Sequence, residues 1–393
     1  MKVGPVPIQT VPRDSGPPSG GPASAPAGPA PLAAPWAEPN PFYAPTLLEP
    51  ALATLDPDHA VHLIEAHDAQ GALIGRMPVV CGARHGRFPV AHSANWIHPH
   101  CFYGAPLLGA GTEELAWAGL LAALERASWS GPFLHLRNVD PDGPAMTALA
   151  RLCAREGRRC EEIDRHERAM LRSPLDAETY WTTHVRAKKR KELRRLQSRL
   201  AELGDLKRDV LRDAAALDPW VDRFLALEAR GWKGARGTAL ASRAADSAFL
   251  RAACARAMAA GQLDMLRIDS GATTIAMLIN FVGPDGGFSF KIAIEPDFAR
   301  YSPGVLIEQD NLARVLDAHV APWMDSCAAP DHPMIDSLWA ERRAIAQYRV
   351  ALRKPGITGL AGRAALPAMT FTEKSYARLK SGLKSGPKPG AQR

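Results

Sequence analysis

The sequence lacks an uninterrupted apolar run of about 18 residues, the length that a membrane-spanning helix needs. Its first residues, MKVGPVPIQTVPRDSG, contain no apolar core of a secretory signal, so we expect a cytoplasmic protein. The six cysteines form no CxxC pair, which favours reduced, mostly buried thiols over a disulfide framework. The G-x-S-x-G elbow, the P-loop and the Rossmann glycine set are also missing, so the signatures of serine hydrolases and common nucleotide-binding folds are excluded.

Apolar residues and positive charge are abundant. Of 393 residues, 46% are hydrophobic, enough for a sizeable core, and the length suggests two domains plus tails. The net charge of +7 favours an anionic partner, which could be a nucleotide cofactor, a nucleic acid or a lipid surface. The first 41 residues contain 12 prolines. We therefore predict a disordered leader over residues 1–40, and a basic flexible tail over residues 357–393.

The rest of the chain presents the same order of predicted elements twice. Residues 41–174 predict a hairpin around DAQG, a helix at EELAWAGLLAALERAS, a strand, a second helix and a last strand. Residues 175–356 predict helices, a hairpin turning at Ser270–Gly271, the strand GGFSFKIAIE, a helix from about Gly304 to Ala318 and a last strand. The predicted fold is therefore α/β (α+β), with two tandem domains that each have a mixed, mostly antiparallel sheet flanked by helices.

Several stretches also resemble a known fold. In the second unit these are KRKELRRLQSRLAELG, FLALEARGWKG, GFSFKIAIEPDFARYSPGVLIEQ and MDSCAAPDHPMIDSLWAERR. They resemble the GNAT acyltransferase fold, in the CelD-like branch of cellulose-biosynthesis acetyltransferases, which is related to the FemAB aminoacyl transferases. The first unit, through NPFYAPTLLEPALATL and FYGAPLL, is similar to the degenerate partner domain of such tandem GNAT-like proteins. The resemblance covers about residues 40 to 355.

This resemblance implies a cytoplasmic transferase that uses acyl-CoA or acetyl-CoA. Its acceptor would be an amine or hydroxyl of cell-envelope or polysaccharide-related chemistry. Two alternatives stay open. A member of the FemAB side would take its acyl group from aminoacyl-tRNA, and a non-catalytic partner of RNA or of polysaccharide machinery would keep only the fold.

The turn ARYSPG lies where the strand passes into the helix. Pro303 suits the first helical position, and Gly304 lets another molecule approach the backbone. Bare N–H groups at a helix start suit a pyrophosphate, although Ser302 could simply cap the helix. Under the resemblance this turn is the CoA loop, and pyrophosphate would bind the N–H groups of Gly304, Val305 and Leu306. The predicted cofactor-binding residues are Arg300, Tyr301, Ser302, Pro303, Gly304, Val305 and Leu306.

Three residues are predicted to be catalytic. Asp325 is placed in chain order to take a proton from an incoming ammonium, with Glu308 and Glu295 as the other acids near the inferred cleft. Tyr301 is a candidate acid for the departing thiolate, and Lys291 could pair with the cofactor or hold the acceptor. Ordinary caps, salt bridges and a solvated strand edge are the alternatives. Because no activated Ser or Cys is recognisable, the predicted mechanism is direct transfer within a ternary complex.

Four residues are predicted to bind substrate. Trp232 and Lys233 lie on a glycine-flanked loop, where the indole could stack on an acceptor or on adenine, or fold back over the core. Lys188 and Arg190 belong to a run of eight positive charges between residues 186 and 199. That run predicts either a solvated amphipathic face or a clamp for an anionic acceptor or tRNA; no helix-turn-helix or zinc pattern supports sequence-specific DNA binding.

The stretch HSANWIHPHC gathers His92, His98, His100 and Cys101, residue types that bind metals. No second cluster with Cys or His spacing completes a coordination shell, so we predict no metal site.

Overall fold

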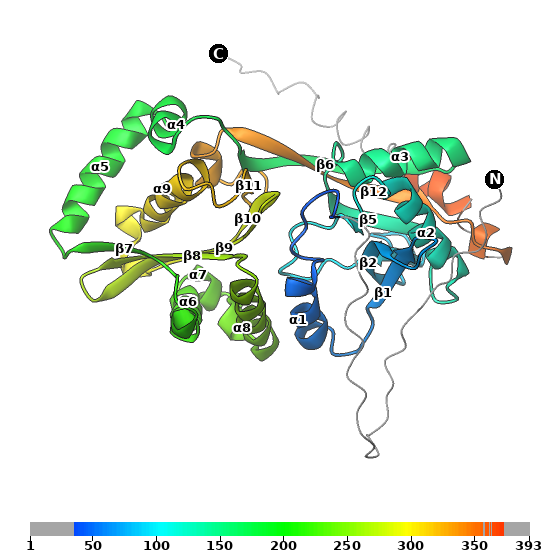
Figure 1. Ribbon diagram of the computed structural model, residues 1–393, viewed down its shortest axis with the longest axis horizontal. Coiled ribbons are helices and arrows are strands. Elements are labelled where there is room, and N and C mark those ends of the chain that lie inside the picture. Colours follow the sequence, from blue (N-terminus) through cyan, green and yellow to red (C-terminus); the bar gives the residue numbers. More distant parts are fainter. Residues whose placement is uncertain (1–34, 357, 361, 363, 373–393) are drawn as a thin grey trace, which may run out of the picture.

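The computed structural model describes residues 35–372, except 357, 361 and 363, and shows two halves joined by one sheet (Figure 1). The first half contains α1 (Pro45–Leu55), β1 (His62–His67), β2 (Leu73–Gly82), β3 (His92–Asn95), β4 (Leu107–Leu108), α2 (Glu113–Arg126), β5 (Phe133–Val139), α3 (Pro144–Glu156) and β6 (Cys160–Leu171). The second half contains α4 (Ala177–His184), α5 (Ala187–Ala201), β7 (Leu206–Val210), α6 (Leu217–Arg230), α7 (Trp232–Ala235), α8 (Ala244–Ala259), β8 (Leu263–Ser270), β9 (Thr273–Gly283), β10 (Gly286–Ile294), α9 (Pro303–Leu316), β11 (Met324–Asp325) and β12 (Glu341–Ala351). Within the described residues, no helix is long and apolar enough to cross a membrane.

The sheet is mixed and mostly antiparallel, as the sequence predicts. Its strand order is β1-β2-β3-β5-β12-β6-β11-β10-β9-β8-β7, with β4 paired to β2. Both predicted hairpins form, as β1–β2 and β8–β9, and Gly71 and Gly271 turn them with positive φ. In the second half, α6, α7 and α8 cover one face of the sheet, and α4, α5 and α9 lie on the other side (Figure 1).

The last strand crosses from one half to the other. β12 lies between β5 and β6, both from the first half, and pairs with β6 from Glu341↔Met170 to Val350↔Cys160. β6 in turn pairs with β11 of the second half through Met324↔Leu171. The predicted boundary between residues 41–174 and 175–356 therefore does not separate two sheets. Figure 1 shows β6 and β12 running side by side between the halves.

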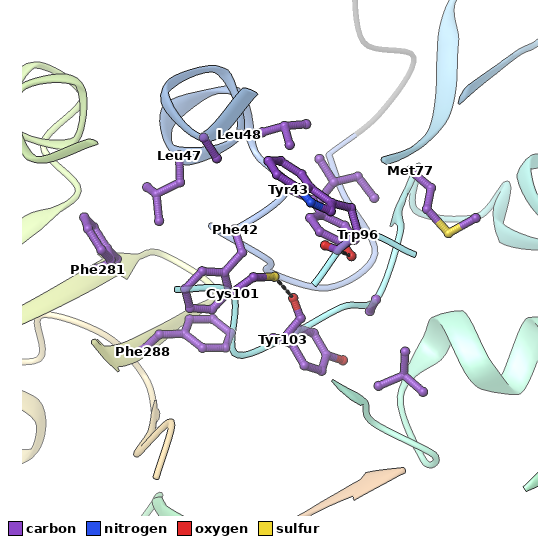
Figure 2. Packing of buried hydrophobic residues seen from close by; sticks show 14 of the residues in the cluster. Phe42, Tyr43, Leu47, Leu48, Met77, Trp96, Cys101, Tyr103, Phe281 and Phe288 are labelled. Carbon is purple, nitrogen blue, oxygen red and sulfur yellow. Dashed lines mark hydrogen bonds between the residues drawn. The ribbon is translucent and has the colours of Figure 1, made fainter. Parts of the chain in front are cut away.

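The two halves also share a hydrophobic core, so they pack as one body. Phe42 of the first half contacts the rings of Phe102 and Phe288, with centroids 5.8 and 5.6 Å away, and Phe288 belongs to β10. Figure 2 shows Phe42 and Tyr103 beside Phe288, and Leu47 of α1 on the side of Phe281. Burial of these aromatic rings between the two halves removes apolar surface from water and stabilises their packing against each other.

Parts of the predicted leader and tail are ordered. Residues 1–34 lie outside the described residues, but Glu38 is buried and accepts a hydrogen bond from the Tyr103 hydroxyl. Trp36 forms a bridge with Gly109. The prediction of a disordered segment up to residue 40 is therefore too long by a few residues. At the other end, residues 364–372 are helical and Met369 is buried near Phe133, so this part of the predicted tail packs on the first half.

Each half contains a short parallel pair of strands connected through a helix. β10 and β11 pair only at Gly287↔Met324 and Phe288↔Asp325, and α9 connects them. β3 and β5 pair only at Ser93↔Leu134 and Ala94↔His135, and α2 lies between them in the chain. Beyond such a short pairing two strands are free to separate, so each half has a place where an opening in the sheet can form.

In the first half, the chain itself fills this place. The Asn95 side-chain amide donates to Gly104 O and to Arg137 O, both at 2.9 Å, and Gly104 N–H donates to Asn138 O at 2.8 Å. A Cβ added at Gly104 would lie 2.3 Å from Arg137 O, so only glycine fits between the strand ends. The segment around Gly104 thus occupies the opening of the first half. The corresponding place in the second half contains a cavity.

Candidate active site

A cavity of about 550 Å³ lies where β10 and β11 separate. One wall is β10 from Ser289 to Ile294, and the opposite wall is residues 326–329, which follow β11. The start of α9 closes one end through Gly304, and Phe102 reaches in from the first half. The remaining lining residues come from α6, α7, α9 and the segment before β12. They are Leu227, Glu228, Gly231, Trp232, Lys233, Glu308, His332, Met334 and Ile335.

A β-bulge shapes the strand wall of this cavity. Ser289 pairs with Asn280 and Lys291 pairs with Ile279, so Phe290 is an extra residue without a partner on β9. Bulges interrupt the alternation of side chains along a strand and change the direction of neighbouring groups. The sequence alternation predicts Phe290 and Lys291 on opposite faces, yet both line the cavity. The bulge explains this difference.

Lys291 lies in the cavity against two aromatic rings. Its ammonium nitrogen is 5.5 Å from the centroid of Phe102 and 5.3 Å from that of Phe290. Burial lowers the pKa of Lys291 to about 8, and the neighbouring Lys233 adds to this, because both effects disfavour the charged form. The structure therefore brings this predicted residue to the candidate site, with an ammonium that exchanges protons near neutral pH. Its catalytic role stays a prediction.

Asp325 is a structural ion-pair residue. Its carboxylate lies 2.7 Å from Arg168 Nε and 3.0 Å from Arg343 Nη1, and it accepts the Cys327 N–H at 2.9 Å. Burial raises the pKa of the Asp325 carboxyl, but the two guanidiniums and the hydrogen bonds outweigh this and hold the pKa below its ordinary value. Asp325 does not line the cavity. This geometry contradicts the prediction that Asp325 takes the proton of the acceptor.

Tyr301 is also placed away from the cavity. It is buried in a cluster with Leu306 and Ile307, and the Arg300 guanidinium lies 4.9 Å from its ring centroid. Arg300 itself is exposed. Neither residue is part of the cavity lining, so the structure does not support Tyr301 as the acid for a departing thiolate.

The start of α9 offers fewer bare N–H groups than the sequence predicts. Ser302 adopts a left-handed conformation with φ of 57° and makes no side-chain cap, which excludes the simple capped start. Val305 N–H and Leu306 N–H both donate to Ser302 O, at 3.0 and 3.3 Å. Pro303 has no N–H, and within the described residues the Gly304 amide has no backbone or side-chain acceptor. Gly304 N–H is therefore the free donor of this turn.

Met334 covers Gly304 and separates two cavities. A Cβ added at Gly304 would lie 3.2 Å from Met334 Sδ. On the other side of Met334 is a second cavity of about 1050 Å³, lined by the start of α9, by α5 and by residues 333–340. Its cationic lining residues are Arg186, Lys188 and Lys189. The start of α9 thus lies between a cavity with basic residues and the cavity at the bulge.

The basic residues of α5 point in different directions. Lys188 is exposed at the second cavity, but Arg190 donates to the backbone oxygens of Thr182 and Val185 and lines a different hollow. Lys189 donates to Ser337 Oγ. The predicted pair of Lys188 and Arg190 therefore does not form one binding surface, because a helix distributes adjacent residues around its axis.

Trp232 and Lys233 both line the cavity, on the short helix α7. Trp232 is 63% exposed, with the Arg236 guanidinium 5.1 Å from its ring, so it does not fold back over the core. Lys233 Nζ lies 2.7 Å from Glu228 Oε1. The structure therefore places an exposed indole and a neutralised lysine at the edge of the cavity.

The predicted metal-like cluster is divided between two places. His92 stacks on Phe133 in the first half, whereas His100 Nε2 lies 3.0 Å from Asp246 Oδ1 of α8. Among the residues that the structure describes, no group of three or more His, Cys, Asp or Glu could hold a metal ion.

Comparison with known proteins confirms the GNAT part of the predicted resemblance. Residues 187–331, less than half of the chain, match the family model described as Acetyltransferase (GNAT) domain. No curated protein matches the chain. The solved structure of FemX is similar with a TM-score of 0.51 and 10% identity, over 79% of this chain and 92% of FemX. This likeness shows a shared fold.

Two further solved structures have lower TM-scores. A tandem GNAT protein from the clavulanic acid biosynthesis pathway matches with a TM-score of 0.42 and 15% identity, over 82% of this chain and 91% of that one. The C-terminal domain of a putative lysylphosphatidylglycerol synthetase from Agrobacterium fabrum matches with a TM-score of 0.47 and 14% identity, over 82% and 94%. The CelD-like branch stays a prediction.

Proposed function

We propose that the protein is an acyltransferase that moves an acyl group from acyl-CoA to an amine or hydroxyl acceptor in the cavity between β10 and β11. The observation that carries this proposal is the separation of β10 and β11 after two paired residues, over a cavity that begins at Gly304 of α9. These elements lie within the segment that matches the GNAT acetyltransferase model, and that match implies the use of acyl-CoA.

The residues around Gly304 suit a long donor with an anionic end and a neutral arm. Lys188 and Arg186 line the second cavity and would hold the phosphates. Gly304 lines the cavity at the bulge, so its free N–H would donate to the part of the donor that passes between the two cavities. The neutral arm would pass Met334, which lines both cavities. The thioester would then lie at the bulge of β10. A molecule bound in this way uses both cavities and explains why glycine stands at position 304.

The cavity favours direct transfer over a covalent acyl-enzyme. Cys327 is the thiol in the cavity lining, and burial raises its pKa well above the ordinary value, with the nearby Asp325 carboxylate adding to this. A thiol that stays protonated is a poor nucleophile. The acceptor would therefore attack the donor directly, and proximity of the two bound substrates would supply much of the rate enhancement.

The acceptor would enter past Trp232. Its exposed ring can stack on a flat or apolar face of the acceptor, and Phe102 of the first half narrows the other side of the cavity. Lys291 would hold an anionic or carbonyl oxygen next to the bulge. The chemical class, a cell-envelope or polysaccharide-related molecule, follows from the CelD-like resemblance.

A second candidate donor is aminoacyl-tRNA. The observation in its favour is a set of exposed cations on α5 without ion-pair partners among the described residues. They are Lys188, Lys191, Arg194 and Arg199. Such charges suit a phosphate backbone longer than that of CoA. The FemAB side of the predicted resemblance has the same implication.

A thermal-shift panel of CoA, acetyl-CoA, longer acyl-CoAs and bulk tRNA tests the donor. Ligand at a hundred times its Kd stabilises the folded state by about 2.7 kcal/mol, which a melt detects easily. We expect acyl-CoAs to raise Tm. A shift with tRNA alone would favour the second candidate, and no shift with any of these ligands would favour a non-catalytic protein of the same fold.

A further inference from the structure

Glu308 is a buried carboxyl group at the cavity wall. It follows Gly304 by one turn of α9, so the two residues share a face of the helix, and both line the cavity. Its exposed fraction is 3%, and no cation pairs with it within the described part of the chain. A buried carboxylate without a cation is costly to the fold. Because Glu308 is buried in this way at a cavity wall, it is a candidate functional residue.

A chain of hydrogen bonds holds the carboxyl group from behind. Asn311 Nδ2 donates to Glu308 Oε2 at 3.2 Å, and Asn280 Nδ2 donates to Asn311 Oδ1 at 2.9 Å. Asn280 Nδ2 also lies 3.3 Å from Asp264 Oδ2, and Arg314 pairs with Asp264 at 2.6 Å. Both asparagines are fully buried. This chain fixes Glu308 Oε2, while Oε1 has no protein partner among the described residues.

The surroundings of Glu308 explain its protonation behaviour. The titratable groups that line the same cavity are Glu228, Lys233, Lys291, Cys327 and His332, and Asp264 faces α9 from β8. Lys233 is paired with Glu228, and Asp264 with Arg314. Burial raises the pKa of Glu308 to about 7, although the hydrogen bond from Asn311 lowers it in part. A carboxyl that titrates near neutral pH suits general base catalysis.

We propose that Glu308 is the proton acceptor of the transfer reaction, a role that rests on the proposed function. Its carboxylate takes one proton from the acceptor ammonium, and the freed nitrogen attacks the thioester carbonyl carbon. The C–N bond forms and the C–S bond breaks, and the second proton of that nitrogen goes to the departing thiolate, which leaves as CoA thiol. Glu308 then releases its proton to solvent. Asn311 is a positioning residue that keeps the carboxyl aimed at the cavity.

The test compares wild type with Glu308→Gln, which keeps the shape and still accepts the Asn311 hydrogen bond. Release of CoA thiol from acetyl-CoA is followed between about pH 5 and pH 9 with ethanolamine as a surrogate acceptor. We expect kcat/KM of wild type to rise through about pH 7. In Glu308→Gln, kcat/KM should be lower by roughly 10²–10⁴-fold and should no longer rise through about pH 7. Acetyl-CoA affinity, measured by calorimetry, should stay unchanged. The matched control is Glu202→Gln, an exposed residue after α5.

A second variant separates chemistry from structure. Asn311→Leu removes a donor that lowers the Glu308 pKa, so the rise of kcat/KM should move to higher pH, which a purely structural role would not cause. This variant also keeps the proposal testable if Glu308→Gln does not fold. If Glu308→Gln keeps the wild-type rate, and kcat/KM of Asn311→Leu rises at the same pH as in wild type, Glu308 is not the proton acceptor. A wild type that neither binds nor cleaves acetyl-CoA would instead overturn the proposed function.

Discussion

Asp325 and Arg168 form an ion pair that is enclosed where the two halves meet. Arg168 Nε lies 2.7 Å from Asp325 Oδ1, and the exposed fractions of the two side chains are 4% and 0%. Arg168 belongs to β6 of the first half and Asp325 to β11 of the second half, while Arg343 of β12 binds the other carboxylate oxygen. These ion pairs therefore link β6 and β12 to β11 of the second half.

Asp325→Asn should destabilise the whole protein. The substitution leaves two buried guanidiniums without their carboxylate, which costs about 3–5 kcal/mol in comparable buried pairs. We expect the midpoint of urea unfolding to fall clearly at neutral pH. Because the folded-state pKa of Asp325 is depressed, its contribution is present above the unfolded pKa and is lost as pH falls through the folded pKa. An Asp325→Asn protein that is as stable as wild type but inactive would instead support a catalytic role.

Substitutions at Gly304 and Met334 distinguish ligand approach from packing. Gly304→Ala places a methyl group about 3.2 Å from Met334 Sδ, so it crowds that side chain and also narrows access to the free amide. Met334→Ala removes the crowding. In the double variant we expect the melting temperature to recover while acetyl-CoA affinity stays low, as measured by thermal denaturation and calorimetry. If the affinity recovers as well, the glycine serves the packing of Met334 alone.

Charge removal on α5 tests the size of the anionic partner. Changing Lys188, Lys191, Arg194 and Arg199 to Gln removes exposed cations, whereas Arg190 should be kept because it supports the backbone of α4. If this face binds RNA, the slope of log affinity for tRNA against log salt should flatten by roughly 0.7–0.9 for each lost phosphate contact. Equal slopes for the variant and wild type would leave these charges as a solvated face.

Glu308→Gln should make the protein more stable at alkaline pH. The folded-state pKa of Glu308 is raised to about 7, so between the unfolded pKa and that value the folded state binds more protons, and stability falls as pH rises. Gln has no charge to bury. Above about pH 7 the variant should therefore melt at a higher temperature than wild type, and the difference should shrink toward pH 5. A pH-independent difference would contradict the raised pKa.

The elements of the fold were predictable because their signals are local. The hairpins, the α9 helix and the β10 strand carry turn residues and apolar periodicity that the sequence displays directly. Trp232, Lys233, Lys291 and Gly304, which the sequence singles out, also line one cavity, while their roles stay predictions. Trp232 begins α7, Gly304 lies in the first turn of α9, and Lys291 belongs to β10, the strand that precedes α9 in the chain.

The features that were missed depend on contacts between distant segments. The position of β12 between β5 and β6 has no local signal, because the sequence of a strand does not specify which strands it pairs with. For the same reason, the pairing of Asp325 with Arg168, 157 positions away, could not be seen, and chain order alone favoured Asp325 over Glu308 as the base. That the segment around Gly104 fills the opening of the first half could not be predicted, because it depends on contacts with Asn95 and with Arg137, which is distant in the sequence.

Calorimetric titration of acetyl-CoA into wild type and Gly304→Asp is the most direct test of the donor site. A Cβ at position 304 would lie 3.2 Å from Met334 Sδ, between the two cavities, so the added carboxylate would block the path of the donor and repel phosphates bound near the start of α9. Two like charges about 4 Å apart at an effective dielectric of about 20 repel by on the order of 4 kcal/mol, or roughly a thousandfold in affinity. We predict that wild type binds acetyl-CoA and that the folded variant, checked by its thermal melt, does not. Equal binding by both proteins, or a wild type that does not bind acetyl-CoA, would contradict the proposed donor site.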